Sequence, residues 1–153
     1  MSTETTITDN ATMQDDFLPS QGMLTVGERF PEFSVQAVIN PDPKNAFQTI
    51  NHNSYPNKWL VIFAWPKDFT PVCSTEIAEF NRLYDDFQDR DAQVLGLSTD
   101  NEYVHLAWRQ SNPNLKDLKF PMMSDLKREI SAECGILDPR SGVAQRATFI
   151  VDP

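Results

Sequence analysis

The stretch from Trp59 to Phe87, "WLVIFAWPKDFTPVCSTEIAEFNRLYDDF", determines how the rest of the chain is organised. Residues 59–65 form an uncharged apolar run rich in β-branched and aromatic side chains, which is typical of a central strand buried on both faces. Pro66 ends that strand because it has no N–H to donate. From Ile77 the apolar side chains recur at the spacing of a helix with one buried face, at Ile77, Phe80, Leu83, Tyr84 and Phe87. The stretch therefore predicts a buried strand, a turn and a helix.

The start of that helix places a cysteine in its first turn. Thr70 suits the N-cap, and Pro71 suits the first helical position, where its missing N–H costs nothing. Cys73 then lies beside unpaired backbone N–H groups and the positive end of the helix dipole, which favour a thiolate over a thiol. Two interpretations follow: an exposed sulfur nucleophile, or a small apolar residue buried in the core.

Length and charge limit the possible functions. A chain of 153 residues is long enough for one domain with a substantial core. Its net charge of −9 makes nucleic acid a poor partner. No apolar run approaches the about 18 residues that a membrane span needs, and the N-terminus lacks the basic and apolar regions of a signal peptide. We therefore expect a cytoplasmic protein, in which two cysteines far apart fit neither a disulfide scaffold nor a zinc site.

The remaining sequence predicts a short tail and one α/β domain. Residues 1–22 are acidic and polar, so we expect a flexible tail, with a short interaction arm around Phe17 and Leu18 as the alternative. Residues 23–153 form the domain. Strands are expected at 33–39, 46–50, 93–98 and 148–151, and helices at 102–110 and at 126–134, the latter ended by Gly135. In the first of these two helices, Tyr103, Leu106 and Ala107 are expected to share one side. Alternating strands and helices predict an α/β fold with helices on the sheet faces.

The loop before the predicted helix resembles that of a known family. "PKDFTPVCSTE", residues 66–76, is similar to the active-site loop of the peroxiredoxins, in which Pro, Thr or Ser, and Cys occupy the positions of Pro66, Thr70 and Cys73. The resemblance covers nearly everything from Met23 onward, most closely the alkyl hydroperoxide reductase C and typical two-cysteine types. It extends to "FPEF" (30–33), "RDAQVLGLSTD" (90–100), "FPMMSD" (120–125) and "RATFIVDP" (146–153).

The resemblance implies a thioredoxin-like fold, a central mixed sheet flanked by helices, and a thiol-dependent peroxidase. In such an enzyme the Cys73 thiolate reduces hydrogen peroxide or an organic hydroperoxide and becomes a sulfenic acid, which another thiol must condense with. No metal, haem or flavin cofactor is implied. The expected partners are a peroxide and an external thiol, or a thioredoxin-like or alkyl hydroperoxide reductase-type reductant. A homodimer or a larger ring is the expected assembly.

Three further residues are expected to serve Cys73. The Thr70 hydroxyl can donate and accept near the sulfur. By resemblance, Arg146 stabilises the thiolate and the leaving oxygen, although the residues alone would make it a solvated strand-end charge. Also by resemblance, Pro66 shapes the loop and shields the sulfur from water, besides stopping the strand.

Other residues have weaker claims. Glu76 matches an acid that orients arginine side chains in the family, but a first-turn acid favourable to the helix dipole is an equal alternative. Arg109 matches a family "WR" pair and is either part of the same network or a helix-surface charge. His52 and His105 stand in unrelated contexts and do not suggest a metal site.

The chain departs from the family pattern at several points. Ser74 stands where two-cysteine members have Pro, and Pro71 where many have Phe, which leaves the subclass open between one-cysteine and two-cysteine mechanisms. Cys134 matches no resolving position and is interpreted as a structural thiol, with an unusual resolving role as the alternative. The chain ends at "VDP", where the family continues, so we expect a truncated C-terminal part.

Two other functions compete with the peroxidase. The first is a thioredoxin-fold binding or chaperone module without a complete catalytic cycle. The second is a thiol–disulfide oxidoreductase, which is disfavoured because that chemistry needs a second cysteine shortly after Cys73, and residues 74–76 contain none.

Overall fold

The computed structural model describes residues 22–153. The expected tail at residues 1–22 therefore lies outside the described residues, apart from Gly22.

Two parallel strands form the centre of the sheet. β3 (Trp59–Ala64) is buried from Leu60 onward, and all seven residues of β4 (Ala92–Ser98) are buried. They pair in parallel from Trp59 opposite Ala92 to Ala64 opposite Leu97. The prediction of a central strand at residues 59–65 is thus confirmed, and its lack of polar alternation follows from burial on both faces.

The described residues form one mixed six-stranded sheet in the order β2-β1-β5-β4-β3-β6. Its outer strands are β1 (Ser34–Val38), β2 (Phe47–Asn51), β5 (Met122–Ser124) and β6 (Ala147–Val151). β3, β4 and β5 run parallel, whereas β1 pairs antiparallel with β2 and β5, and β6 pairs antiparallel with β3. The α/β prediction is confirmed. The sequence missed β5 because a strand of three residues is too short to show a period.

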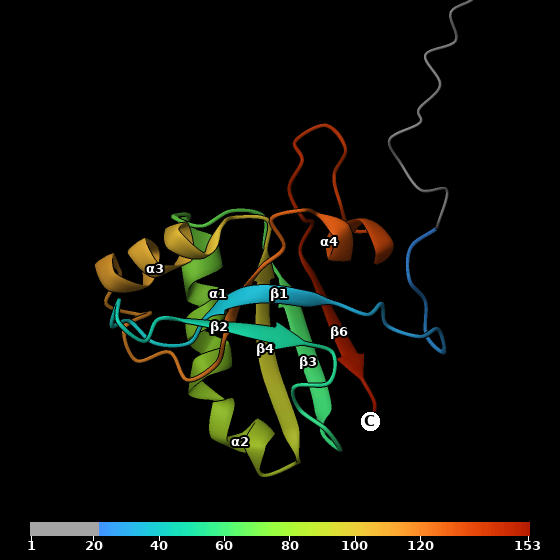
Figure 1. The fold of residues 1–153 in the computed structure, drawn as a ribbon, viewed down its shortest axis with the longest axis horizontal. Helices are drawn as coiled ribbons and strands as arrows, with labels where there is room; N and C mark the ends of the chain where they lie inside the picture. Colours follow the sequence, from blue (N-terminus) through green and yellow to red (C-terminus); the bar gives the residue numbers. More distant parts are fainter. Residues whose placement is uncertain (1–21) are drawn as a thin grey trace, which may run out of the picture.

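Helices cover both faces of the sheet and close two cores. α1 (Pro71–Arg82), α2 (Tyr84–Gln88) and α3 (Glu102–Ser111) lie on one side, and α4 (Glu129–Glu133) lies on the other (Figure 1). The first core contains Phe63, Ile77 and Leu106. The second contains Ile62, Leu95 and Ile130. Adjacent residues of β3 contribute to opposite cores, as the strand period of two requires.

The helix predicted to reach Phe87 is divided in two. α1 ends at Arg82, the backbone of the C-cap residue Leu83 (φ −92°, ψ 4°) leaves the helical region, and α2 begins at Tyr84. The face predicted for α3 is wrong except at Leu106. Its buried residues are His105, Leu106, Trp108 and Arg109, whereas Ala107 is exposed and Tyr103 is 67% exposed. Counting only apolar residues placed the face wrongly because two members of the buried face are polar.

α4 is shorter than the helix predicted at 126–134. Arg128 precedes it with a left-handed backbone (φ 62°), which prevents a helix from continuing back to Leu126. Gly135 follows the C-cap residue Cys134 with φ 72°, so the predicted glycine stop is confirmed. Within the described residues, no helix has the length and apolarity that a membrane crossing needs.

Candidate active site

The loop after β3 delivers Thr70 and Pro71 to the start of α1 as predicted. Thr70 is the N-cap residue with an extended backbone (φ −112°, ψ 143°), and Pro71 occupies the start of the helix. The Thr70 side chain does not cap the helix, because its Oγ1 donates to the carbonyl oxygen of Lys67 (3.0 Å). The cap prediction is therefore right for the backbone and wrong for the side-chain contact.

Cys73 lies in the first turn of α1, where the sequence placed it. The first hydrogen bond of the helix runs from the amide of Ser74 to the carbonyl of Thr70 (3.3 Å), so Cys73 precedes the intrahelical ladder. The expected exposure is wrong, since Cys73 is only 1% exposed. It shares the face of α1 that packs on the sheet with Ile77, one turn further along, and both belong to the first core.

Arg146 reaches the sulfur from the neighbouring strand. β6 runs antiparallel to β3 with Ala147 opposite Ala64, so the preceding Arg146 lies at the end of β3 where the loop begins. Its Nη2 donates to the Cys73 Sγ (3.2 Å), and its Nη1 donates to the Glu76 Oε2 (2.5 Å). The structure therefore brings together Cys73, Arg146 and Glu76, although 70 residues separate Glu76 from Arg146.

The charge of Arg146 faces an otherwise buried sulfur. The hydrogen bond to Cys73 raises the pKa of the Arg146 guanidinium above its ordinary value, and the bond to Glu76 adds to the shift. The side chain is 39% exposed and that of Glu76 is 28% exposed, so solvent weakens their ion pair. Orientation is the larger effect of Glu76, because one nitrogen held by a carboxylate leaves the other directed at Sγ.

Pro66 stands where the sheet ends. The amide of Trp65 makes the last ladder bond of this strand, to the carbonyl of Leu97 (3.0 Å), and Pro66 has no N–H to extend it. The predicted strand stop is thereby confirmed. Its shielding of the sulfur stays a prediction.

A buried ionisable pair joins this loop to α3, and the sequence did not predict it. Asp68 Oδ2 is hydrogen bonded to His105 Nδ1, and the two side chains are 1% and 0% exposed. The sequence indicated only that His105 and His52 do not form a metal site. A signal was present, because His105, Trp108 and Arg109 follow the i, i+3, i+4 spacing of one helix face.

Arg109 is neither part of the Cys73 network nor a helix-surface charge, which were the two alternatives expected from the sequence. It is 2% exposed, and its Nη2 donates to the carbonyl oxygen of Leu118, far from a surface position. Burial lowers the pKa of Arg109 to about 10. Its contacts within residues 22–153 do not include Cys73, Glu76 or Arg146, so it fixes the segment before β5 rather than the sulfur.

Cys134 lies in the second core, on the face of the sheet opposite Cys73. It is 0% exposed, and burial raises the pKa of its thiol to about 12. A thiol that stays protonated at neutral pH is a poor nucleophile. These features support the structural interpretation of Cys134.

The ligand geometry of a metal centre does not occur among residues 22–153, where no cluster of three or more His, Cys, Asp or Glu is suitably placed. His52 Nδ1 is paired with the carbonyl oxygen of Phe33 (3.3 Å), and Asn53 contacts its other ring nitrogen (3.1 Å). The two histidines are thus held in separate environments.

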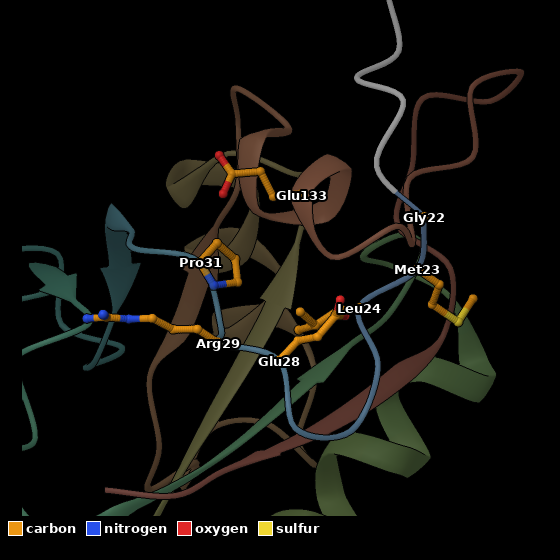
Figure 2. Close-up of a pocket in the computed structure, with 7 residues that line it drawn as sticks. All are labelled: Gly22, Met23, Leu24, Glu28, Arg29, Pro31 and Glu133. Carbon is orange, nitrogen blue, oxygen red and sulfur yellow. The ribbon is translucent and has the colours of Figure 1, made fainter.

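A pocket of about 370 Å³ lies elsewhere, between the segment after Gly22 and α4 (Figure 2). Met23, Leu24 and Glu133 are among its lining residues, and Cys73, Thr70 and Arg146 are not. Cys73 therefore lies in a closed site rather than in this pocket.

Comparisons with known proteins show the family and the fold of this chain. The family model described as "AhpC/TSA family" matches residues 26–153. The chain belongs to the AhpC/TSA family. Its six-stranded mixed sheet is the thioredoxin-like fold that the family resemblance implied, because it superposes on the solved structure of Mycobacterium tuberculosis AhpC with a TM-score of 0.80. That structure is 50% identical to this chain in sequence, and the match covers 86% of this chain and 78% of the chain in that structure.

Two relatives found by sequence belong to the same group of enzymes. Alkyl hydroperoxide reductase C of Mycolicibacterium smegmatis is 53% identical over 139 residues, which are 86% of this chain and 71% of the relative. The mitochondrial thioredoxin-dependent peroxide reductase of Drosophila melanogaster is 40% identical over 126 residues, which are 80% of this chain and 52% of the relative. The family resemblance drawn from the motifs is confirmed.

Proposed function

We propose that Cys73 is the nucleophile with which this family member reduces peroxides. The observation that carries the proposal is the 3.2 Å contact between Arg146 Nη2 and the Cys73 Sγ at the start of α1. A fixed positive charge and a helix N-terminus both stabilise a thiolate, which is the reactive form of cysteine. The chain is a thiol-dependent peroxidase, as its relatives named alkyl hydroperoxide reductase and peroxide reductase support.

The reaction is a displacement at oxygen. The Cys73 thiolate attacks one peroxide oxygen, the O–O bond breaks, and the other oxygen leaves as an alkoxide or hydroxide that takes a proton from water. Sulfur keeps the attacked oxygen as a sulfenic acid. Arg146 stabilises both the thiolate and the departing negative charge with its forked donors. Thr70, the N-cap residue of the same helix, supplies a hydroxyl that orients the peroxide, and Pro66 excludes water.

Regeneration needs another thiol. It condenses with the sulfenic acid to a mixed disulfide and releases water, and a second thiol then releases the Cys73 thiolate. Since Cys73 is 1% exposed, the loop or the first turn of α1 must open before a thiol bound to another protein can reach the sulfur.

Finer features of the function are proposals that rest on family membership. The reductant is a small external thiol, or a thioredoxin-like or alkyl hydroperoxide reductase-type protein. The assembly is a homodimer or a larger ring, the compartment is the cytoplasm, and residues 23–153 act as the catalytic domain behind the acidic tail. The alternative of a binding or chaperone module is not favoured, because the relatives are named as reductases.

Peroxide consumption tests the proposal directly. Without added thiol, the protein should consume about one equivalent of hydrogen peroxide per chain, and with a small thiol present it should turn over. Cys73→Ser should abolish both, whereas the matched variant Cys134→Ser should retain them. Equal consumption by Cys73→Ser and the unsubstituted protein would show that Cys73 is not the nucleophile.

A further inference from the structure

The loop that carries the catalytic residues is anchored at Asp68, two residues before Thr70. Asp68 Oδ1 accepts from the indole Nε1 of Trp65 (2.8 Å), and Oδ2 is bonded to His105 Nδ1. Its amide donates to Asp100 Oδ2 (2.9 Å). Through this one residue the loop is attached to the end of β3, to the segment after β4 and to α3.

The ring of His105 extends the attachment to β5. Its Nε2 is hydrogen bonded to the carbonyl oxygen of Met123 (3.0 Å). A carbonyl only accepts, so Nε2 carries a proton. Nδ1 faces a carboxyl oxygen, and one further proton lies between the two groups, on His105 beside an ionised Asp68 or on Asp68 beside a neutral ring. In both arrangements the pair is neutral, which suits two side chains without solvent access.

The ionisable groups around this pair are few among the described residues. Asp100 faces it from the segment after β4, and its Oδ2 also accepts from the Ser98 hydroxyl (2.8 Å). β3 contributes the indole of Trp65, and β5 contributes a backbone oxygen. Trp65 is itself fixed, because a Cβ at Gly96 would lie 2.6 Å from its ring.

We propose that the Asp68–His105 pair is a positioning pair that holds the loop closed over Cys73 and thereby sets the peroxide rate and the accessibility of the sulfur. This inference rests on the proposed peroxidase function. Phe69 and Thr70 follow the anchored residue directly, and Phe69 adopts a left-handed backbone (φ 60°), which persists only when neighbouring contacts impose it. Release of Asp68 removes the contact that imposes this conformation, so the N-terminus of α1 loses its alignment with Arg146.

The pair gives the closed loop a dependence on pH. Burial lowers the pKa of His105, but the hydrogen bond and charge of Asp68 outweigh it, so this pKa lies above its ordinary value. Burial raises the pKa of Asp68 because it disfavours the ionised carboxylate, so both shifts keep a proton on the pair. For His105, the stabilisation by the raised pKa is fully present below its ordinary value of about 6.5 and is lost as pH rises through the folded value. Above that pH two lone pairs face each other, at Nδ1 and Oδ2, and the loop opens.

Asp68→Asn and Asp68→Ala separate this role from simple packing. The Asn side chain can accept from Trp65 and donate to a neutral His105, so it keeps the contacts without an ionisable carboxyl. Asp68→Ala removes both contacts. We expect Asp68→Ala to react with hydrogen peroxide about tenfold or more slowly, since a misplacement of about 1 Å can cost on the order of 100-fold. Asp68→Asn should stay within about twofold of the unsubstituted protein at neutral pH.

Alkylation of Cys73 by iodoacetamide, followed by peptide mass spectrometry, measures opening independently of peroxidase activity. Asp68→Ala should be alkylated about tenfold faster, consistent with local opening. Between neutral and alkaline pH, the alkylation rate of the unsubstituted protein should rise relative to that of Asp68→Asn. Only the unsubstituted protein loses the proton that Asp68 and His105 share. Because both proteins carry the same cysteine, the ratio of the two alkylation rates reports the opening of the loop. Ile130→Ala, in the second core, controls for lost stability without touching the loop.

Each outcome bears on the proposal. A constant ratio between the two alkylation rates across pH would overturn it, as would an Asp68→Asn variant as slow as Asp68→Ala at neutral pH. If Asp68→Ala does not fold, the Asp68→Asn comparison decides alone. An unsubstituted protein that is inert to peroxide would contradict the proposed function, whereas the alkylation profiles would still test the pair.

Discussion

At the scale of single residues, the guanidinium of Arg146 does what no other side chain in the site can do. Two of its nitrogens are used at once, one on the Cys73 Sγ and one on Glu76 Oε2. Lysine keeps the charge but is a single point of donation on a flexible stem, so it cannot hold the carboxylate and the sulfur in a fixed geometry.

Arg146→Lys should therefore lower the second-order rate constant with hydrogen peroxide by about tenfold or more. Stopped-flow kinetics of Cys73 oxidation measures this rate constant. Glu76→Gln is the matched control, because the amide oxygen still accepts from Nη1 and the guanidinium remains oriented. The rate constant of Glu76→Gln should therefore fall less than that of Arg146→Lys. An unchanged rate in Arg146→Lys would reduce Arg146 to the strand-end charge that its sequence context alone suggests.

At the scale of elements, α1 and α3 begin differently although both have suitable N-cap residues. Asn101 Oδ1 accepts from the amide of Val104 (2.9 Å) and caps α3, whereas the Thr70 hydroxyl donates to Lys67 and leaves α1 without a side-chain cap. An uncapped helix start leaves amide donors free beside Cys73. The hydroxyl of Thr70 thus bonds within the loop rather than capping α1, which leaves it available for the substrate role proposed above.

Two substitutions test that difference. Asn101→Ala should lower the free energy of unfolding by about 1 kcal/mol, the usual cost of a lost cap. Thr70→Val should lower it by about 0.5 kcal/mol or less, as for a substitution that breaks no cap. Thr70→Val should nevertheless reduce the peroxide rate by about tenfold or more, and Thr70→Ser should restore most of it. Urea denaturation and peroxide kinetics give the two quantities. Equal destabilisation by the first two substitutions would show that Thr70 caps α1 in solution.

The elements also show what sequence patterns can and cannot predict. β3 and the start of α1 were predictable because a buried run, a proline and an N-cap residue are local signals. β5 was not, since a strand of three residues has no period, and the buried face of α3 was not, because His105 and Arg109 are buried through contacts with distant carbonyl and carboxyl oxygens. Such partners lie 9 to 37 residues away along the chain.

At the scale of the whole molecule, the sheet separates the two cysteines. Cys73 and Cys134 belong to cores on opposite faces. The contact of Cys73 with Arg146 spans 73 residues, and only the resemblance to a family indicated it in advance. The Asp68–His105 pair has no such motif, because tertiary folding alone brings its two members together. The sequence, read with the family resemblance, therefore predicted that Arg146 lies beside Cys73, but not the pair between the loop and α3.

This separation determines how the 153-residue chain responds to excess peroxide. A sulfenic acid at Cys73 cannot condense with Cys134 while the sheet lies between them, and the Cys134 thiol, with a pKa raised to about 12 by burial, is not ionised at neutral pH. Without added thiol, we expect Cys73 to progress to sulfinic and then sulfonic acid, with irreversible loss of activity as the peroxide concentration rises. Intact-mass spectrometry should show gains of two and three oxygen atoms. The Cys134→Ser variant should show the same gains as the unsubstituted protein. A monomer that instead loses the mass of two hydrogens would carry an internal Cys73–Cys134 disulfide, which would make Cys134 a resolving cysteine and require an opening of the second core.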